Sequence, residues 1–186
     1  DYRHFSKEVL KEITVKPISF EVFSDELDEM QRQGLEIASW GENVYVKIPI
    51  TTTTGESTAS VVKHLTKQGV KVNVTALMTE AQVRDVLEVL DPATPSYISI
   101  FAGRIADTGR NPVPIMITAL ELLKSNKQCE LIWASPRELL NVFQANEIGC
   151  HIITATNDIL KKLELVGYDL TAYSLDTVKM FRRDAV

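Results

Sequence analysis

Val44-Tyr45-Val46-Lys47-Ile48-Pro49 is the stretch that decides the fold of this chain. Its β-branched run, closed by a proline, is typical of a buried strand. The lysine in its middle is unusual, because moving an ammonium group away from water costs free energy. Two explanations stand open: Lys47 pairs with a carboxylate, or its nitrogen is kept ready to react with a substrate.

Similar apolar segments recur along the chain and alternate with segments of helical periodicity. Strands are expected at residues 17–23, 44–49, 70–77, 97–103, 129–134 and 150–155. Helices are expected at residues 1–13, 24–40, 56–67, 79–90, from 112 onward, 135–146, 159–165 and 175–183. Regular alternation of this kind is typical of a parallel sheet with right-handed crossovers.

Two parallel architectures compete, an open doubly wound sheet and a (β/α)8 TIM barrel. A doubly wound sheet has strands that are apolar on both faces. Here only alternate positions are apolar: Ile18, Phe20, Val22, Val44, Val46, Ile48, Val72, Val74, Ala76, Ile98, Ile100 and Ala102. The other positions hold Ser19, Glu21, Tyr45, Lys47, Lys71, Asn73, Thr75, Ser99 and Phe101. Strands with one polar face suit a barrel whose interior carries a site, so the barrel is predicted.

A closed barrel of this type has eight βα units, and six are evident over residues 1–186, which we interpret as a single barrel domain. An open six-stranded sheet would leave two unpaired strand edges. We therefore expect two further strands before Asp1 and regard this sequence as incomplete at its amino end. The intact mass of the native protein tests this expectation.

Composition narrows the class of protein. The chain has 186 residues, 45% of them hydrophobic, and a formal net charge of −5 without a basic cluster. This argues against a nucleic-acid or anionic-membrane surface. Cys129 and Cys150 are interpreted as reduced thiols of a cytoplasmic protein, and the three histidines show no metal-ligand spacing. No metal site is expected, nor a membrane helix or signal peptide.

Polar side chains converge at the carboxyl halves of four consecutive predicted strands: Glu21, Lys47, Asn73, Thr75 and Ser99. Active sites of TIM barrels are built at this end. A lone lysine would most simply form an ion pair with Glu21. Five converging polar groups instead favour a functional site, in which an unprotonated lysine attacks a carbonyl to form a Schiff base.

An anion site is predicted beside this constellation. Arg104 follows the fourth strand, and Ser135-Pro136-Arg137-Glu138 has the spacing of a capping box that begins a helix. A helix amino terminus with two guanidinium groups nearby suits a phosphate. Taken alone, Ser135 is explained as an ordinary helix cap, and each arginine as a solvated surface charge. An imine-forming lysine beside an anion site indicates a sugar-phosphate substrate.

These motifs resemble those of the transaldolase family, including its small branch related to fructose-6-phosphate aldolase. The matching stretches are Ser19-Phe20-Glu21-Val22, Val46-Lys47-Ile48-Pro49, Asn73-Val74-Thr75, Ile98-Ser99-Ile100-Phe101-Ala102-Gly103-Arg104-Ile105 and Ala134-Ser135-Pro136-Arg137. They follow one another on successive strands. Pro136 departs from the aromatic residue usual in the family, and Phe101 is more like transaldolases than the aldolase branch.

The resemblance implies a (β/α)8 barrel that needs no cofactor, with Lys47 as the Schiff-base lysine. It implies that Glu21 and Thr75 hold a catalytic water, and that Asn73 and Ser99 contact the bound sugar beside Phe101. Arg104, Ser135 and Arg137 would bind its phosphate. The family's acid/base aspartate and its Thr-Asn-Pro motif would both precede Asp1. Homo-oligomers, pentamers or decamers, are implied, with the C-terminal helix reaching a neighbour.

Three functions are therefore carried forward. The first is a class I transaldolase that transfers a dihydroxyacetone unit from a ketose phosphate, such as fructose or sedoheptulose phosphate, to an aldose phosphate. The second is an aldolase that releases the three-carbon unit or accepts free dihydroxyacetone. The third is a non-catalytic barrel that binds sugar phosphates.

Overall fold

The computed structural model describes residues 1–185. The chain divides into two compact units at Thr154, and the second, called here the Ala155–Val186 unit, is described up to Ala185. The first unit contains all the strands: β1 (Ile18–Glu21), β2 (Val44–Pro49), β3 (Val72–Leu77), β4 (Ser96–Ile100), β5 (Cys129–Trp133) and β6 (Ile152–Ile153). Its helices are α1 (Tyr2–Glu12), α2 (Leu27–Ala38), α3 (Ala59–Lys67), α4 (Glu80–Val89), α5 (Ala102–Asp107), α6 (Val113–Leu123) and α7 (Leu140–Glu147).

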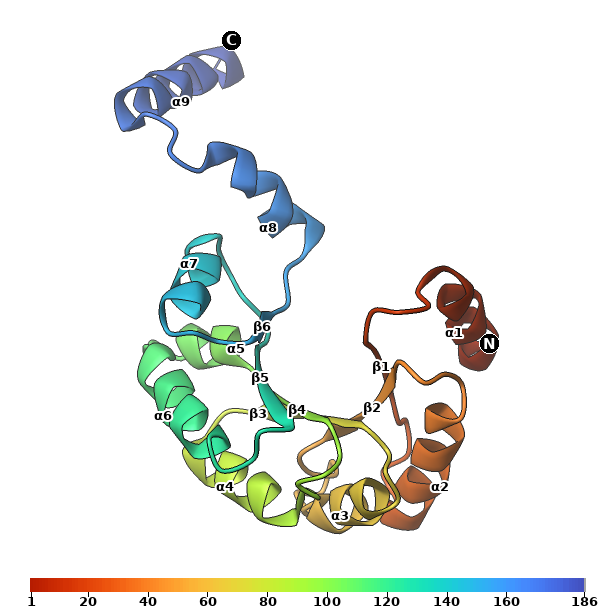
Figure 1. The fold of residues 1–186 in the computed structure, drawn as a ribbon. Coiled ribbons are helices and arrows are strands. Elements are labelled where there is room, and N and C mark those ends of the chain that lie inside the picture. Colours follow the sequence, from red (N-terminus) through yellow and green to blue (C-terminus); the bar gives the residue numbers. More distant parts are fainter. Residues whose placement is uncertain (186) are drawn as a thin grey trace. The chain divides into compact units, whose positions relative to one another are not determined.

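The six strands form one parallel sheet in the order β1-β2-β3-β4-β5-β6, so every strand pairs with its neighbours in sequence. Figure 1 shows this sheet curled into a half-barrel, with α2, α3, α4 and α6 along its convex side. An α/β fold with six units of the TIM-barrel pattern was predicted, and the structure confirms it.

The main core lies between the convex face of the sheet and the helices. Alternate strand residues such as Val46, Ile48, Val72, Val74 and Ile98 are fully buried in it. Burying one such side chain contributes about 1.5–3 kcal/mol. A smaller cluster lies on the other face, where Tyr45, Tyr97, Ile132 and Ala134 pack together. The two tyrosine rings stack with centroids 4.1 Å apart.

The strand β3 departs from strict alternation near its end. Its register with β4 shifts between Val74 and Leu77, and Ala76 has a φ of +66°. Leu77, rather than Ala76, therefore takes the fully buried position. Ala76, predicted to continue the apolar face, is half-buried and packs against the main core, while the bulge gives the fully buried position to Leu77.

Three of the predicted helix starts are also corrected. Ser24 does not cap α2, whose N-cap is Glu26; its hydroxyl accepts a bond from the Glu26 N–H instead. Pro112 is the N-cap of α6 rather than its first residue. By contrast, the helix expected at residues 79–90 begins as predicted, with Thr79 and Gln82 forming a capping box at the start of α4. The correction at Ser135 belongs to the functional site and is described there.

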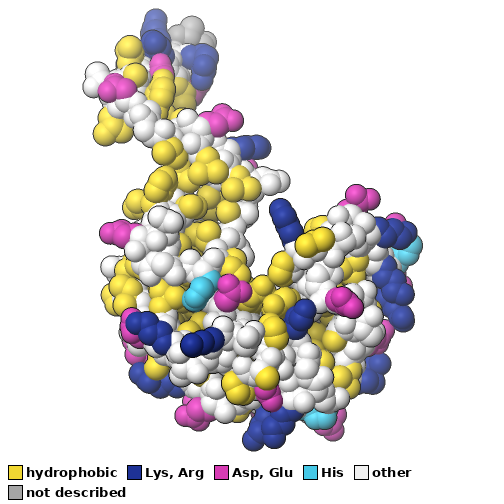
Figure 2. Space-filling view, viewed as in Figure 1, with side chains coloured by type: hydrophobic (Ala, Val, Ile, Leu, Met, Phe, Trp, Pro, Cys, Tyr) yellow, Lys and Arg dark blue, Asp and Glu magenta, His cyan; other side chains and the backbone are white. Residues whose placement is uncertain are grey.

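The second unit consists of α8 (Asn157–Lys161), a 3-10 turn η1 (Lys162–Leu165) and α9 (Leu170–Asp184). Helix α9 begins earlier than predicted, because Asp169 caps it by accepting a hydrogen bond from the Ala172 N–H. The Tyr168 hydroxyl donates to Asp176, 2.7 Å away. Many apolar side chains of this unit are exposed, and Figure 2 shows them gathered among charged ones. No helix within residues 1–185 is long and apolar enough to cross a bilayer.

Candidate functional site

A cavity of about 590 Å³ lies on the concave face of the sheet. The lining includes six of the predicted site residues: Lys47, Asn73, Thr75, Ser99, Phe101 and Ser135. These come from β2, β3 and β4 and from the segments that follow β4 and β5. The structure therefore brings together side chains that lie far apart in sequence, on the face and near the strand ends where TIM barrels build their sites.

Lys47 lies in a strand whose neighbours Val46 and Ile48 are fully buried, while its own side chain reaches the cavity. Its Nζ lies 3.4 Å from Glu21 Oε2, with 30% of the lysine side chain and 43% of the glutamate side chain exposed. Water therefore reaches the Lys47 side chain, although its neighbours in the strand are fully buried. An ion pair this open adds little stability.

Asn73, the register partner of Lys47 on β3, connects three strands. Its Nδ2 donates to Ser19 Oγ at 3.0 Å, and Ser99 Oγ donates to its Oδ1 at 2.8 Å. Asn73 and Ser99 are both buried. Ser19 lines the cavity but was not among the predicted site residues. Its inward position two residues before Glu21 was the available signal, because alternate residues of a strand share one face.

Thr75 lies on the same wall, with 2% of its surface exposed. Its Oγ1 is buried and makes no hydrogen bond within the described residues. Buried hydroxyl groups without a partner are uncommon, and each calls for an explanation. A polar group inside the cavity, such as a ligand oxygen or a bound water, would satisfy this one.

The predicted anion site is built differently from the expectation. Ser135 is not a helix cap: it has a φ of +59°, and α7 begins only at Leu140. The N-cap of α7 is Leu139, which has no side chain that could cap the helix. Asn141 Oδ1 instead holds the segment before the helix, accepting from the N–H groups of Arg137 and Glu138 at 2.8 and 3.2 Å. The spacing of a capping box was present, but Pro136 and the left-handed Ser135 turn the chain away before the helix starts.

The two arginines lie outside the residues that line the cavity. Arg137 Nη2 pairs with Asp107 Oδ2 at 2.5 Å, and the Arg104 guanidinium lies 5.7 Å from the centre of the Phe101 ring. Both side chains are exposed. Phe101 thus connects Arg104 with the cavity, and Arg137 lies two residues after Ser135.

Gly103 allows the two loops of this region to meet. A Cβ at this position would lie 1.5 Å from the Ser135 carbonyl oxygen, so no other residue fits without moving the backbone. The Gly103 N–H donates to the Ala134 carbonyl at 3.4 Å. The close contact brings the start of α5 against the segment after β5, which is where Arg104, Ser135 and Arg137 occur.

The cysteines, histidines and acidic residues of the described chain form no metal site. Within residues 1–185, no three His, Cys, Asp or Glu side chains converge as they would around a metal ion. Cys129 is buried, and burial raises the pKa of its thiol to about 12, so the thiol stays protonated at neutral pH. Burial also raises the pKa of the Cys150 thiol.

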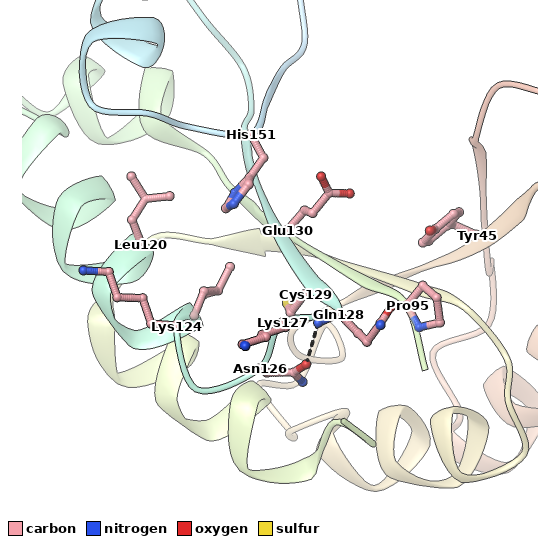
Figure 3. Close-up of a pocket in the computed structure, with 11 residues that line it drawn as sticks. Tyr45, Pro95, Leu120, Lys124, Asn126, Lys127, Gln128, Cys129, Glu130 and His151 are labelled. Atoms are coloured by element: carbon pink, nitrogen blue, oxygen red, sulfur yellow. Dashed lines mark hydrogen bonds between the residues drawn. The ribbon is translucent and has the colours of Figure 1, made fainter. Parts of the chain in front are cut away.

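A second cavity, of about 520 Å³, opens at the opposite end of the strands. Figure 3 shows Glu130 and His151 beside it, with Lys127 and Tyr45 at its edges. His151 Nδ1 accepts from the Leu131 N–H at 3.0 Å, so that nitrogen is already occupied. This cavity lies at the amino ends of β4 and β5, where a TIM barrel does not place its chemistry.

Comparison with known proteins identifies the family. The sequence model for "Transaldolase/Fructose-6-phosphate aldolase" matches residues 3–185 of this chain. The chain belongs to this family. The match covers the sheet, the cavity with Lys47 and the C-terminal helices, and it confirms the resemblance drawn from the motifs.

Curated relatives agree with this assignment. A "Probable transaldolase" from Thermoanaerobacter sp. (strain X514) is 34% identical over 176 residues, which are 92% of this chain and 77% of that protein. A protein of the same name from Herpetosiphon aurantiacus is 30% identical over 178 residues, covering 94% and 76%. A "Probable transaldolase 2" from Listeria monocytogenes is 36% identical over 162 residues, covering 84% and 70%.

A solved structure supports the fold alone. A GMP reductase variant from Trypanosoma brucei, in complex with guanosine 5'-monophosphate, superposes with a TM-score of 0.52 at 12% sequence identity. The match covers 77% of this chain and 30% of that one. At such low identity the likeness concerns the arrangement of strands and helices, and it carries nothing about activity.

Proposed function

We propose that this protein acts as a class I transaldolase with Lys47 as its Schiff-base lysine. The observation that carries the proposal is the Lys47 ammonium at a cavity of the concave face. It lies 3.4 Å from Glu21 and shares the cavity with the Ser19–Asn73–Ser99 chain of hydrogen bonds. Family membership and relatives named as transaldolases support it. The substrates would be sugar phosphates, a ketose phosphate as donor and an aldose phosphate as acceptor.

The reaction begins with the unprotonated Lys47 amine, whose lone pair attacks the ketone carbon of the donor. Loss of water from the carbinolamine gives an iminium ion. A base then removes the proton of the C4 hydroxyl, the C3–C4 bond breaks, and the leaving aldose phosphate departs as an aldehyde. The bond's electron pair remains on the lysine-bound three-carbon unit as an enamine. The enamine attacks the acceptor aldehyde, and water hydrolyses the new imine and frees Lys47.

The neighbouring side chains receive supporting roles in this proposal. Glu21 and Thr75 hold the water that relays protons, in agreement with the unpartnered Thr75 hydroxyl. Asn73 and Ser99 bind hydroxyl groups of the sugar, and Phe101 lines the same wall. Arg104, Ser135 and Arg137 bind the phosphate; Arg137 would exchange Asp107 for it, one anion for another.

The proposal extends to the state of the protein in the cell. We place it in the cytoplasm as a homo-oligomer of barrel domains spanning residues 1–186, and we assign it no cofactor. Catalysis by an amine nucleophile requires none, because the lysine itself supplies the electron sink for carbon–carbon cleavage.

The acceptor dependence of turnover tests the transfer reaction against the nearest alternative. The family description includes fructose-6-phosphate aldolase, which makes simple cleavage the second candidate. With fructose 6-phosphate as donor, a transaldolase forms product only when erythrose 4-phosphate is added. Equal consumption of the donor without the acceptor would assign the aldolase reaction instead. Calorimetric binding of the donor with no turnover in either assay would contradict both and leave a binding barrel.

A further inference from the structure

Ser19 occupies a place in the cavity that the proposed reaction leaves without a role. It lies on β1, and its Oγ accepts a hydrogen bond from Asn73 Nδ2 at 3.0 Å, across the strand that carries Lys47. Ser99, on β4, holds the other end of the same amide at 2.8 Å. All three side chains line the cavity with Lys47.

These two hydrogen bonds fix the orientation of the Asn73 side-chain amide. Asn73 is 5% exposed, and it pairs in register with Lys47 on the neighbouring strand. A primary amide has two N–H donors, of which Ser19 engages one. With both ends of the amide tied to serines of other strands, the side chain is restricted to one rotamer. The second N–H then keeps a constant direction relative to the lysine.

We propose that Ser19 is a positioning residue that holds the Asn73 amide so that its free N–H binds a ligand oxygen beside Lys47. Preorganised donors bind more tightly than mobile ones because the cost of ordering them has been met on folding. The kinetic part of this inference rests on the proposed function, whereas the orientation of the Asn73 amide can be measured without it.

Three substitutions separate the role of Ser19 from simple packing. Ser19→Ala removes the acceptor, Ser19→Cys keeps nearly the same size with a much weaker acceptor, and Ser19→Thr restores a hydroxyl. Ser96→Ala is the matched control, because Ser96 is a buried serine of β4 whose hydroxyl bonds only to the Thr94 carbonyl. Thermal unfolding confirms that each variant folds.

The first measurement is hydrogen exchange of the Asn73 side-chain amide in protein labelled with ¹⁵N-asparagine, its signal identified by its loss in Asn73→Ala. Exchange is expected to become roughly two- to tenfold faster in Ser19→Ala and Ser19→Cys, which corresponds to the loss of one hydrogen bond of ordinary strength. It should stay near wild type in Ser19→Thr and Ser96→Ala. Unchanged exchange in Ser19→Ala and Ser19→Cys would overturn the inference.

The second measurement is the steady-state reaction with fructose 6-phosphate and erythrose 4-phosphate. Ser19→Ala is expected to raise the KM for the donor about tenfold, with kcat within about twofold, because binding is lost equally in the ground and transition states. In the Asn73→Ala background the same change should add little, since the two residues act as one unit. A fall in kcat alone, or effects equal to those of Ser96→Ala, would overturn it. A wild type without turnover would contradict the proposed function, and the exchange measurement would still decide the position of Asn73.

Discussion

Lys47 illustrates how a strand that lines an apolar core can also carry an amine. Alternation places Val46 and Ile48 against the helices and turns the lysine to the concave face, where solvent reaches part of it. The sequence left an ion pair and a reactive amine as alternatives. With 30% and 43% of the two side chains exposed, the pair with Glu21 contributes little to folding, which favours the reactive amine.

Thr75 offers a test at the same scale. Its buried hydroxyl has no hydrogen-bond partner among residues 1–185, so replacing threonine with the isosteric valine removes a desolvation penalty. Thr75→Val is expected to leave the free energy of unfolding unchanged or to raise it by about 1 kcal/mol. The transfer rate should fall roughly 100-fold, if the hydroxyl holds the water that moves protons. Urea unfolding and steady-state kinetics measure the two effects. A less stable variant of unchanged rate would contradict this role.

At the scale of elements, the strands could be predicted from the sequence because two-residue alternation is a local signal. Every predicted strand is present, and the first four direct polar side chains such as Ser19, Lys47 and Asn73 to the cavity on the concave face. The bulge near the end of β3 and the turn after β5 could not be predicted. Ala76 and Ser135 adopt positive φ values although neither is glycine, and only the packing of the surrounding chain imposes such a conformation.

The contact between the loops after β4 and β5 depends on Gly103. Gly103→Ala would put a Cβ 1.5 Å from the Ser135 carbonyl oxygen, a backbone atom that cannot rotate away. We expect a loss of about 3 kcal/mol or more in the free energy of unfolding. Gly34→Ala is the control, because its Cβ meets only the end of the Leu65 side chain, at 2.6 Å. That variant should stay within about 1 kcal/mol of wild type, since alanine favours the helix. An equal loss of unfolding free energy in both variants would contradict the role given to Gly103 in the contact between the two loops.

Asp25 ties the loop after β1 to the threonine-rich loop after β2. The Thr53 hydroxyl and the Thr53 N–H both donate to its carboxylate, and these bonds lower the pKa of Asp25 from its ordinary value of 3.8. At pH values above 3.8, the ionised Asp25 carboxylate therefore stabilises the folded chain. The contribution is lost as the pH falls through the lowered pKa of the folded state.

Asp25→Asn should accordingly be less stable than wild type near neutral pH, with the difference shrinking toward acid. Urea unfolding from about pH 7 to about pH 3 measures it. Asp85→Asn, at an exposed acidic residue in the middle of α4, serves as the control for the loss of one surface charge. If the gap between wild type and Asp25→Asn stayed constant down to the lowest pH, the Thr53 bonds would not be its cause.

For the whole molecule, the fold class and the centre of the site could be predicted, but the edge of the site could not. Lys47, Asn73, Thr75 and Ser99 follow from strand periodicity, which places them on one face. Arg104 and Arg137 lie beyond the strand ends, and the position of a loop side chain depends on contacts between distant loops. The structure places both arginines outside the cavity lining, one against Phe101 and one with Asp107.

The apolar side chains of the Ala155–Val186 unit lead to a prediction about assembly. Leu170, Val178 and Phe181 are exposed on α9, and exposed apolar groups in this number indicate an interaction surface. We expect Val178→Glu/Phe181→Glu to lower the oligomer mass seen by light scattering, because a charge in an apolar interface must be desolvated. Ser174→Glu on the same helix is the control. A wild type that is monomeric at working concentrations would contradict the prediction.

Reductive trapping of Lys47 tests the central claim most directly. Incubation with fructose 6-phosphate and borohydride, followed by peptide mass analysis, should show a reduced three-carbon or hexose phosphate adduct on Lys47. Lys47→Arg keeps the charge beside Glu21 but removes the nucleophile, so this variant should take no label. Lys71→Arg is the control and should be labelled like wild type, because the Lys71 ammonium is bonded to the Glu42 carbonyl. Absence of an adduct in wild type, or a label that persists in Lys47→Arg, would contradict the account.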